Sequence, residues 1–202
     1  MQISEGEPAG LRERKRQRTR ETIARVALEL FDRQGFQETT IPQIAEAADV
    51  SPRTVSAYFP HKEDLAFPDV DAEFDALEAR MRDRPAEETA VAALRAWIGS
   101  WLEDGDVSAI QRQTRHRVIR ADDDLRAYEH RFTLRARQVI AAAIARDLGV
   151  PPGDLEPRMA AAATLTVFEV LGEDHETAEP AEALAVVDRA LLFIDGGISA
   201  LR

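Results

Sequence analysis

The chain has 202 residues, a formal net charge of −11 and 45% hydrophobic residues, enough apolar content to build one or two folded domains. It contains no cysteine, which excludes disulfides and thiol chemistry and is typical of the reducing cytoplasm, where we expect this protein. It has no apolar run long enough to span a membrane, and residues 1–10 lack the apolar core of a secretory signal.

The acidic charge is unevenly distributed along the chain. Residues 11–62 carry ten Lys or Arg and seven Asp or Glu, a net charge of +3. Residues 66–202 carry sixteen Lys or Arg and twenty-six Asp or Glu, a net charge of −10. An acidic body can orient a basic end toward a polyanion such as DNA, although acidic surfaces also simply keep proteins soluble.

Residues 1–17 are predicted to form a flexible basic arm. Residues 1–10 are polar and contain Gly and Pro, and six of the nine residues 12–20 are basic. Such an arm can follow phosphates or enter a minor groove; the alternative is a solvated, charged helix start. A period of 3.6 then predicts a helix from Thr19 to Gln34, ended by Gly35.

The next segment, residues 40–65, has the pattern of two short helices joined by a tight turn. Thr40 and Gln43 form a capping-box pattern at the start of the first helix. Ser51 is an N-cap for the second helix, Pro52–Tyr58, because Pro is favoured at the first helical position.

This second helix directs Val55 and Phe59 inward and leaves a small, polar outer face. A helix of that kind can lie in the major groove of DNA and bring side chains to base edges. The pattern is therefore that of a helix-turn-helix, although an ordinary helical hairpin inside an all-α domain has similar caps and prolines.

The rest of the chain is also predicted to be helical, with breaks at Gly, Pro and polar residues. Pro68 interrupts a helix that runs to Arg82 and is a candidate hinge, and Gly196-Gly197 is predicted to stop the last helix. The other helices are expected at residues 87–102, 107–119, 122–148, 154–171 and from 180 onward. The predicted fold class is all-α, with an N-terminal three-helix unit followed by a larger helical domain.

Three stretches in fixed order carry a resemblance to a known family: TRETIARVALELFDRQGF, TTIPQIAEAADVS and RTVSAYFPHKEDL. Residues 18–65 resemble the N-terminal domain of the TetR family of bacterial transcriptional regulators. The resemblance implies a DNA-binding domain at residues 18–66 and an effector-binding and dimerisation domain at residues 67–202. One position departs from the family, which usually has a phosphate-contacting Tyr where this chain has Ser56.

The resemblance further implies that a homodimer binds a palindromic, double-stranded DNA operator through Pro52–Tyr58. In that arrangement Arg53, Thr54 and Ser56 would face bases. Phosphates would be held by Thr40, Tyr58, Lys62 and the basic arm. The full predicted DNA-binding set is Arg18, Thr40, Gln43, Ser51, Arg53, Thr54, Ser56, Tyr58, His61 and Lys62.

In the resembled family, the last two helices pair with their copies in a second subunit; the alternative is that they only close the core of one subunit. The middle helices would enclose a small-molecule effector, and the Arg-rich run 112–120 could anchor an acidic or acyl-type one. Alternatively, the aromatic residues at helical spacing belong to the ordinary hydrophobic core, and the Arg-rich run is a solvated helix face. The candidate residues are Trp97, Trp101, Arg115, His116, His130, Phe132, Phe168 and Glu169.

The sequence thus predicts a ligand-responsive transcriptional regulator, most simply a repressor, with no catalytic residues, cofactor or metal. The four histidines lack metal-ligand spacing, and the chain has neither a glycine-rich phosphate loop nor a Gly-x-Ser-x-Gly elbow. Two alternatives stay open: a helical small-molecule-binding protein without specific DNA recognition, and an all-α enzyme.

Overall fold

The computed structural model describes residues 9–103, 109–174 and 180–200 and divides into two compact units. The first unit contains the chain up to Pro68 together with Arg117–Arg126, and the second contains Asp69–His116 and the chain from Ala127 onward. All regular structure in the described ranges is helical, which confirms the predicted all-α class. None of the helices in these ranges is both long and apolar enough to cross a membrane.

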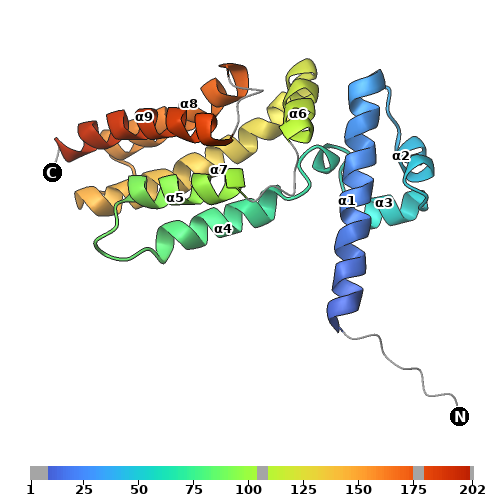
Figure 1. Ribbon diagram of the computed structural model, residues 1–202, viewed down its shortest axis with the longest axis horizontal. Coiled ribbons are helices and arrows are strands. Elements are labelled where there is room, and N and C mark those ends of the chain that lie inside the picture. The colour runs from blue at the N-terminus through green and yellow to red at the C-terminus, as the bar shows by residue number, and fades with distance from the viewer. Residues whose placement is uncertain (1–8, 104–108, 175–179, 201–202) are drawn as a thin grey trace, which may run out of the picture. The chain divides into compact units, whose positions relative to one another are not determined.

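The N-terminal part of the first unit consists of α1 (Ala9–Gln34), α2 (Ile41–Ala47), α3 (Pro52–Tyr58) and the short 3-10 turn η1 (Glu63–Leu65) (Figure 1). Gly35 adopts a φ of +92° directly after α1, as expected for a C-terminal stop. The core lies between α1 and the two short helices, and its buried side chains include Ile23, Phe31, Phe36, Ile44, Val55 and Phe59.

The start of α1 differs from the expectation. The helix begins at Ala9 rather than Thr19, so residues 9–17 of the predicted flexible arm are helical, while residues 1–8 lie outside the described ranges. The physical reason is local propensity, because Arg, Lys, Gln and Glu are good helix formers even without tertiary contacts.

A second difference concerns what completes the core of this unit. The end of α6 (Ala109–Ala121) and the start of α7 (Asp123–Leu148) bury three side chains in the same cluster as α1, α2 and α3. These side chains are Val118, Ile119 and Leu125. The rest of this cluster comes from residues 23–66, far earlier in the chain, so no local pattern could have revealed the contact.

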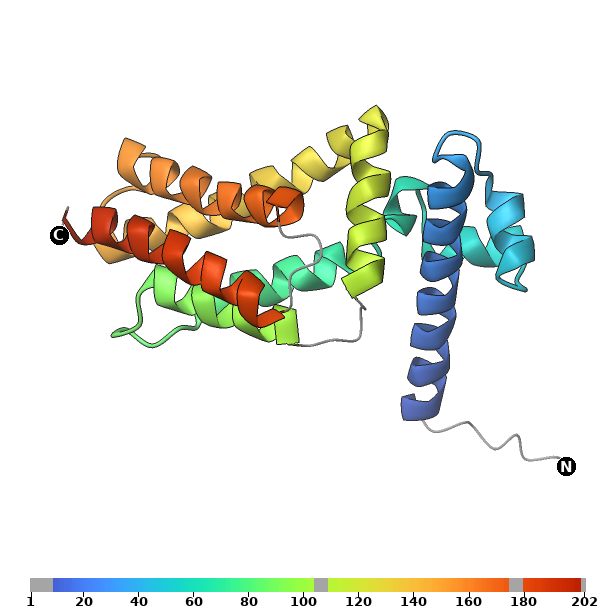
Figure 2. The same ribbon diagram turned by 45° about the horizontal axis from the view of Figure 1, so that its top comes forward.

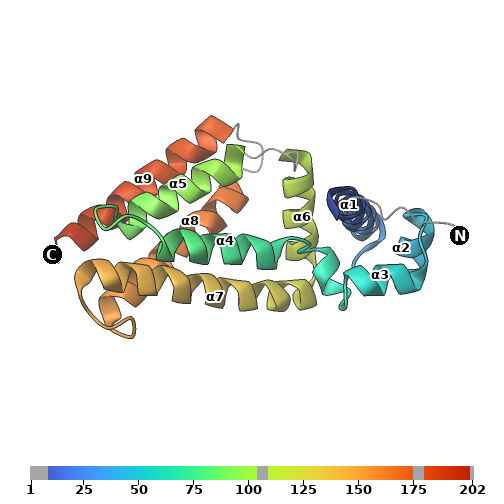
Figure 3. The same cartoon turned by 90° about the horizontal axis from the view of Figure 1, so that it is seen from below.

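The second unit contains α4 (Val70–Arg82), α5 (Ala90–Glu103), the remainders of α6 and α7, α8 (Leu155–Asp174) and α9 (Pro180–Ser199). Figure 2 shows α8 and α9 side by side. Figure 3 shows α4 running along α7, and side chains of the two helices contact each other. The helix α8 extends past its expected end at residue 171, and α9 continues past Gly196-Gly197, which were predicted to stop it. In α9 the buried stripe Val187, Leu191, Ile194 extends to Ile198, so packing outweighs the cost of about 1 kcal/mol for each helical glycine.

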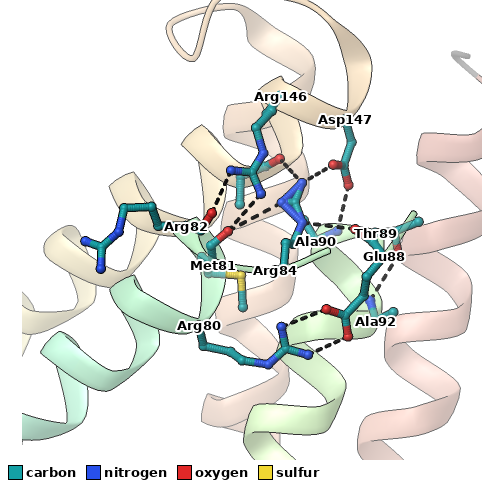
Figure 4. A network of polar contacts seen from close by, with 11 residues as sticks. Arg80, Met81, Arg82, Arg84, Glu88, Thr89, Ala90, Ala92, Arg146 and Asp147 are labelled. Atoms are coloured by element: carbon teal, nitrogen blue, oxygen red, sulfur yellow. Dashed lines mark hydrogen bonds and ion pairs between the residues drawn. The ribbon is translucent and has the colours of Figure 1, made fainter. Parts of the chain in front are cut away.

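One buried ion pair joins the turn between α4 and α5 to the end of α7 (Figure 4). The side chain of Arg84 is 2% exposed and contacts the carboxylate of Asp147, while it also donates to the carbonyls of Glu88 and Ala143 at 3.1 Å each. Asp147 in turn accepts from the backbone N–H of Ala90 at 2.6 Å. A buried charge is tolerated only when it is paired and hydrogen-bonded, and both conditions are met here.

Candidate nucleic-acid interface

The two-turn helix α3 has one buried face and one open face. Val55 is 0% exposed and Phe59, which caps the helix, is 2% exposed, so both anchor α3 in the core of the first unit. The opposite face carries four exposed residues: Pro52, Arg53, Ser56 and Ala57. This outward presentation of a small, polar face is what the sequence predicted for a helix that reads DNA.

The predicted helix caps are present. The hydroxyl of Ser51 accepts the backbone N–H of Thr54 at 3.0 Å and lies 2.7 Å from the hydroxyl of Thr54. At the start of α2, the side chain of Gln43 accepts the backbone N–H of Thr40 at 2.8 Å, and the Thr40 hydroxyl accepts that of Gln43 at 3.4 Å. These bonds satisfy backbone donors that a helix N-terminus leaves open, and they occupy the Thr54 hydroxyl.

The turn between α2 and α3 contains a backbone conformation that side chains rarely adopt. Asp49 has a φ of +53°, in the left-handed region that Asp tolerates better than most residues. The backbone N–H of Val50 donates to the carbonyl of Ala45 at 2.9 Å, which closes the end of α2. The turn therefore holds α2 and α3 at a defined angle without a glycine.

Arg20 connects α1 to the C-terminal end of α3. One of its guanidinium nitrogens donates to the carbonyl of Tyr58 at 3.1 Å, and another donates to the carbonyl of Pro68. The guanidinium also lies 4.5 Å from the centre of the Phe59 ring. Sequence reasoning assigned Arg20 only to the basic run, because its partners lie 38 and 48 residues further along the chain.

Lys62, a predicted phosphate contact, has its ammonium group engaged within the first unit. Its ammonium group donates to the carbonyl of Phe36 and lies 4.2 Å from the centre of the Phe36 ring. Burial lowers the pKa of Lys62, against the opposing effect of Glu63, Asp122 and Glu38. The side chain is thus turned into the first unit, where it holds the loop after α1.

His61 is exposed, and its backbone N–H donates to the carboxylate of Asp64 at 2.9 Å. The residues that follow form only the short 3-10 turn η1, and no side chain caps it at Lys62. Of the remaining predicted contacts, Arg18, Thr40 and Gln43 are exposed, and Tyr58 is half-buried against the core.

Polar contacts reinforce the packing of Arg117–Arg126 in the first unit. The guanidinium of Arg117 donates two hydrogen bonds to the carboxylate of Asp32, at 2.8 and 3.0 Å. The side-chain amide of Gln37 donates to Asp122 at 3.0 Å and to Asp124 at 2.9 Å. The hydrogen bond from Arg117 lowers the pKa of Asp32, burial opposes this effect, and the positive charge of Arg117 adds to the lowering.

Comparison with known proteins identifies the family. A model described as bacterial regulatory proteins of the tetR family matches residues 23–67, and the model of the MftR C-terminal domain matches residues 88–199, more than half of the chain. The chain belongs to the TetR family of bacterial transcriptional regulators. The family and the relatives found are transcriptional regulators, not enzymes.

The curated relatives include TcmR of Streptomyces glaucescens, an HTH-type transcriptional regulator that is 42% identical over 105 residues, which are 50% of this chain and 46% of TcmR. The match thus spans about half of TcmR. MftR of Mycobacterium tuberculosis, whose name assigns it to the regulation of mycofactocin biosynthesis, is 29% identical over 73% of this chain and 75% of its own length.

Among solved structures, NalD of Pseudomonas aeruginosa, the secondary repressor of the MexAB-OprM multidrug efflux pump, superposes with a TM-score of 0.60 at 21% identity. The superposition covers 89% of this chain and 96% of NalD. At this identity the likeness concerns the fold alone, which is that of the TetR family.

In this TetR-family chain, the second unit places two predicted effector residues beside each other on α6. The Nε atom of Arg115 and the Nε2 atom of His116 are buried without a hydrogen-bond partner in the described part of the chain. Burial lowers the pKa of Arg115, and the carboxylates of Glu73 and Asp69 oppose this effect. An unsatisfied buried donor is costly, which marks this point of α6 as a candidate polar site.

The other predicted effector residues are not all brought together. Trp97 and Phe132 are half-buried, and the Phe132 ring stacks on Phe74 at 5.9 Å, as an ordinary core contact would. His130 is exposed, and its assignment to the effector site stays a prediction. The side chains of Trp101, Phe168 and Glu169 lie outside the described residues.

A cleft of about 560 Å³ lies elsewhere in the second unit, where the turn between α4 and α5 meets the end of α7. No predicted effector residue lines it; the lining residues are Arg84, Pro85, Ala86, Glu87, Glu88, Thr89, Arg146 and Asp147. In the part of the chain that the structure describes, no group of three or more His, Asp or Glu is arranged to hold a metal ion.

Proposed function

We propose that this protein is a ligand-responsive transcriptional repressor of the cytoplasm, which binds a palindromic DNA operator as a dimer. The observation that supports this most directly is the open face of α3 opposite the fully buried Val55. With that face in the major groove, Arg53 can donate two hydrogen bonds to a guanine edge and Ser56 can contact a neighbouring base.

The remaining predicted contacts would position the protein on the DNA backbone. The exposed Thr40 hydroxyl and the half-buried Tyr58 flank the ends of α2 and α3, where phosphate oxygens run past a helix seated in the groove. Ser51 and Thr54 contribute mainly by capping α3, and Gln43 by capping α2, because the two hydroxyls and the side-chain carbonyl of Gln43 are occupied by those bonds.

Dimerisation is proposed through α8 and α9, which pack against each other and have outward apolar faces. On α9, Leu192 is 74% and Phe193 is 84% exposed; on α8, Leu155 and Met159 are 63% and 61% exposed. The exposed Ala162 and Ala163 share the α8 face with them, since their spacing is helical. A second copy of the chain is the occupant that we assign to this surface, because members of the family usually act as dimers.

The effector is proposed to bind in the second unit near Arg115 and His116, and an acidic group would satisfy the buried N–H donor of Arg115. The signal would pass along α6 and α7, because Arg117–Arg126 belongs to the core of the DNA-binding unit. An effector can act in this way only by binding one arrangement of that segment more tightly than the other.

The test is a titration of labelled duplex containing the DNA upstream of the protein's own gene against a random duplex of equal length. We expect binding to the upstream duplex at least tenfold tighter, and loss of that ratio in Arg53→Ala. Arg137→Ala, an exposed arginine of α7, is the matched control and should keep the ratio. Equal affinity for both duplexes would instead favour a small-molecule-binding protein without specific DNA recognition.

A further inference from the structure

The first turns of α1, residues 10–18, contribute no side chain to the buried core of the first unit. The side chains of residues 10–18 are exposed, and the core of the first unit begins only at Ile23. Figures 1 and 2 show this stretch continuing past α2 and α3 toward the N-terminus. A function other than core formation therefore has to account for its composition.

The composition of this basic extension is electrostatically unfavourable by itself. Arg12, Arg14, Lys15, Arg16 and Arg18 surround the single acid Glu13, and the first turn of α1 contains no acidic residue. Positive charge at a helix N-terminus opposes the helix dipole, and like charges four residues apart repel each other. Sequences carry such locally unfavourable charges mainly at functional sites. A bound polyanion would offset both the unfavourable interaction with the helix dipole and the repulsion between the like charges.

The register of α1 directs part of this charge to one side. Arg12, Arg16 and Arg20 follow each other at intervals of four residues, so they lie on one face of α1. That face continues toward the core as Ile23 and Ala27, against which the short helices pack. In addition, Arg20 donates to the carbonyl of Tyr58, the last residue of α3.

This register places Arg16 about 6 Å and Arg12 about 12 Å along α1 from Arg20, since an α-helix rises about 1.5 Å per residue. Both side chains are exposed. The phosphates of one DNA strand follow each other at about 3.4 Å along the duplex axis, so a stripe of this length spans several of them.

We propose that residues 9–18 form a helical phosphate-binding extension, in which Arg12 and Arg16 contact the DNA backbone outside the base pairs read by α3. This inference rests on the proposed DNA-binding function and extends it to a second, sequence-independent contact in each subunit. The extension adds affinity and salt dependence but no base discrimination, because phosphates carry no sequence information.

The experiment compares the full-length R12Q/R16Q variant with the charge-matched control R137Q/R158Q, which removes two exposed arginines of the second unit. Affinity is measured for the upstream duplex and for random duplex over a series of salt concentrations. Each lost phosphate contact reduces the magnitude of the slope of log K against log salt by about 0.9. For R12Q/R16Q we therefore expect a slope that is smaller in magnitude by about 1.8 per subunit on both duplexes. Hydrogen exchange of residues 12–18 should also slow on DNA binding in the wild-type protein.

The two proposals can fail separately. A slope for R12Q/R16Q equal to that of R137Q/R158Q, with amides 12–18 unprotected on DNA, would overturn the phosphate-binding extension even if the upstream duplex is bound specifically. Conversely, a wild-type protein that fails to discriminate the two duplexes contradicts the proposed function, whereas a reduced slope for R12Q/R16Q on random duplex would still support the extension. Thermal unfolding of both variants controls for loss of structure.

Discussion

The guanidinium of Arg20 donates to the backbone carbonyl of Tyr58 at 3.1 Å, so a residue of α1 holds the last turn of α3. Carbonyls at a helix C-terminus lack intrahelical donors, and a cation is favourable there because of the helix dipole. The bond therefore fixes the orientation of α3 from the helix against which it packs.

Replacing this arginine should loosen α3. Arg20→Met keeps the apolar stem but removes the donors to Tyr58 and Pro68, and we expect it to lower the free energy of unfolding by about 1–3 kcal/mol. Urea unfolding measures this, and binding to the upstream duplex should weaken in parallel. Arg33→Met, an exposed arginine at the end of the same helix, should change neither quantity by more than about 0.5 kcal/mol.

Two serines of the α3 region, the N-cap Ser51 and the exposed Ser56, can be compared. Ser51→Ala removes the acceptor of the Thr54 N–H and should cost about 1 kcal/mol in the free energy of unfolding. Ser56→Ala, on the open face of the same helix, should leave stability within about 0.5 kcal/mol and weaken only DNA binding. Equal stability of the two variants by chemical denaturation would contradict the capping role of Ser51.

The ion pair of Asp32 and Arg117 should make stability depend on pH. Because Arg117 lowers the folded-state pKa of Asp32, its contribution is fully present above the unfolded-state pKa of about 3.9 and is lost as the pH falls through the folded-state value. At pH 7 the free energy of unfolding of Asp32→Asn should therefore be lower than that of the wild-type protein by up to about 1 kcal/mol, since the pair is partly exposed. As the pH falls from 5 to 3, the free energy of unfolding should decrease less in Asp32→Asn than in the wild-type protein.

Urea unfolding at pH 7, 5, 4 and 3 measures this difference. Asp154→Asn removes an equal charge from an exposed turn and serves as the control. If the Asp32→Asn and Asp154→Asn curves coincide at every pH, the contact between α1 and Arg117–Arg126 does not stabilise the protein.

Breaking the buried ion pair of Arg84 and Asp147 in the second unit should cost much more stability than breaking an exposed one. Arg84→Met leaves the carboxylate of Asp147 without its cation, and we expect a loss of about 3–5 kcal/mol in the free energy of unfolding. Arg80→Met breaks the neighbouring, more exposed pair with Glu88 and should cost no more than about 1 kcal/mol. Differential scanning calorimetry of both variants measures this ranking, and a larger loss for Arg80→Met than for Arg84→Met would contradict it.

The proposed dimer surface predicts a change of assembly. The double variant L192D/F193D places two charges on the exposed face of α9 and should give a monomer by analytical ultracentrifugation, with operator affinity reduced more than tenfold. Ile110→Asp alters an equally exposed apolar residue on α6 and should leave the mass unchanged. A dimer that survives L192D/F193D at micromolar concentration would rule out this face of α9.

Much of the DNA-binding unit could be read from the sequence because its signals are local. The capping pairs Thr40–Gln43 and Ser51–Thr54 lie three residues apart, and the stop at Gly35 acts on the turn before it. Each of these depends on neighbours within about one helical turn, so the start of α2 and both ends of α3 were predicted from the sequence. The predicted stop at Gly196-Gly197 was wrong, because the burial of Ile198 stabilises the continuation of α9 beyond these glycines.

The sequence by itself determined the helix type, the caps and the outward polar face of α3, because those follow from hydrogen bonds and periodicity within a few residues. Only the tertiary structure decided that Lys62 turns inward to Phe36, that Arg20 holds Tyr58, and that Arg117–Arg126 completes the core of the first unit. These contacts join residues 26 to 87 positions apart. Their contribution to the folding free energy depends on which distant parts of the chain come together, and no local sequence pattern encodes that.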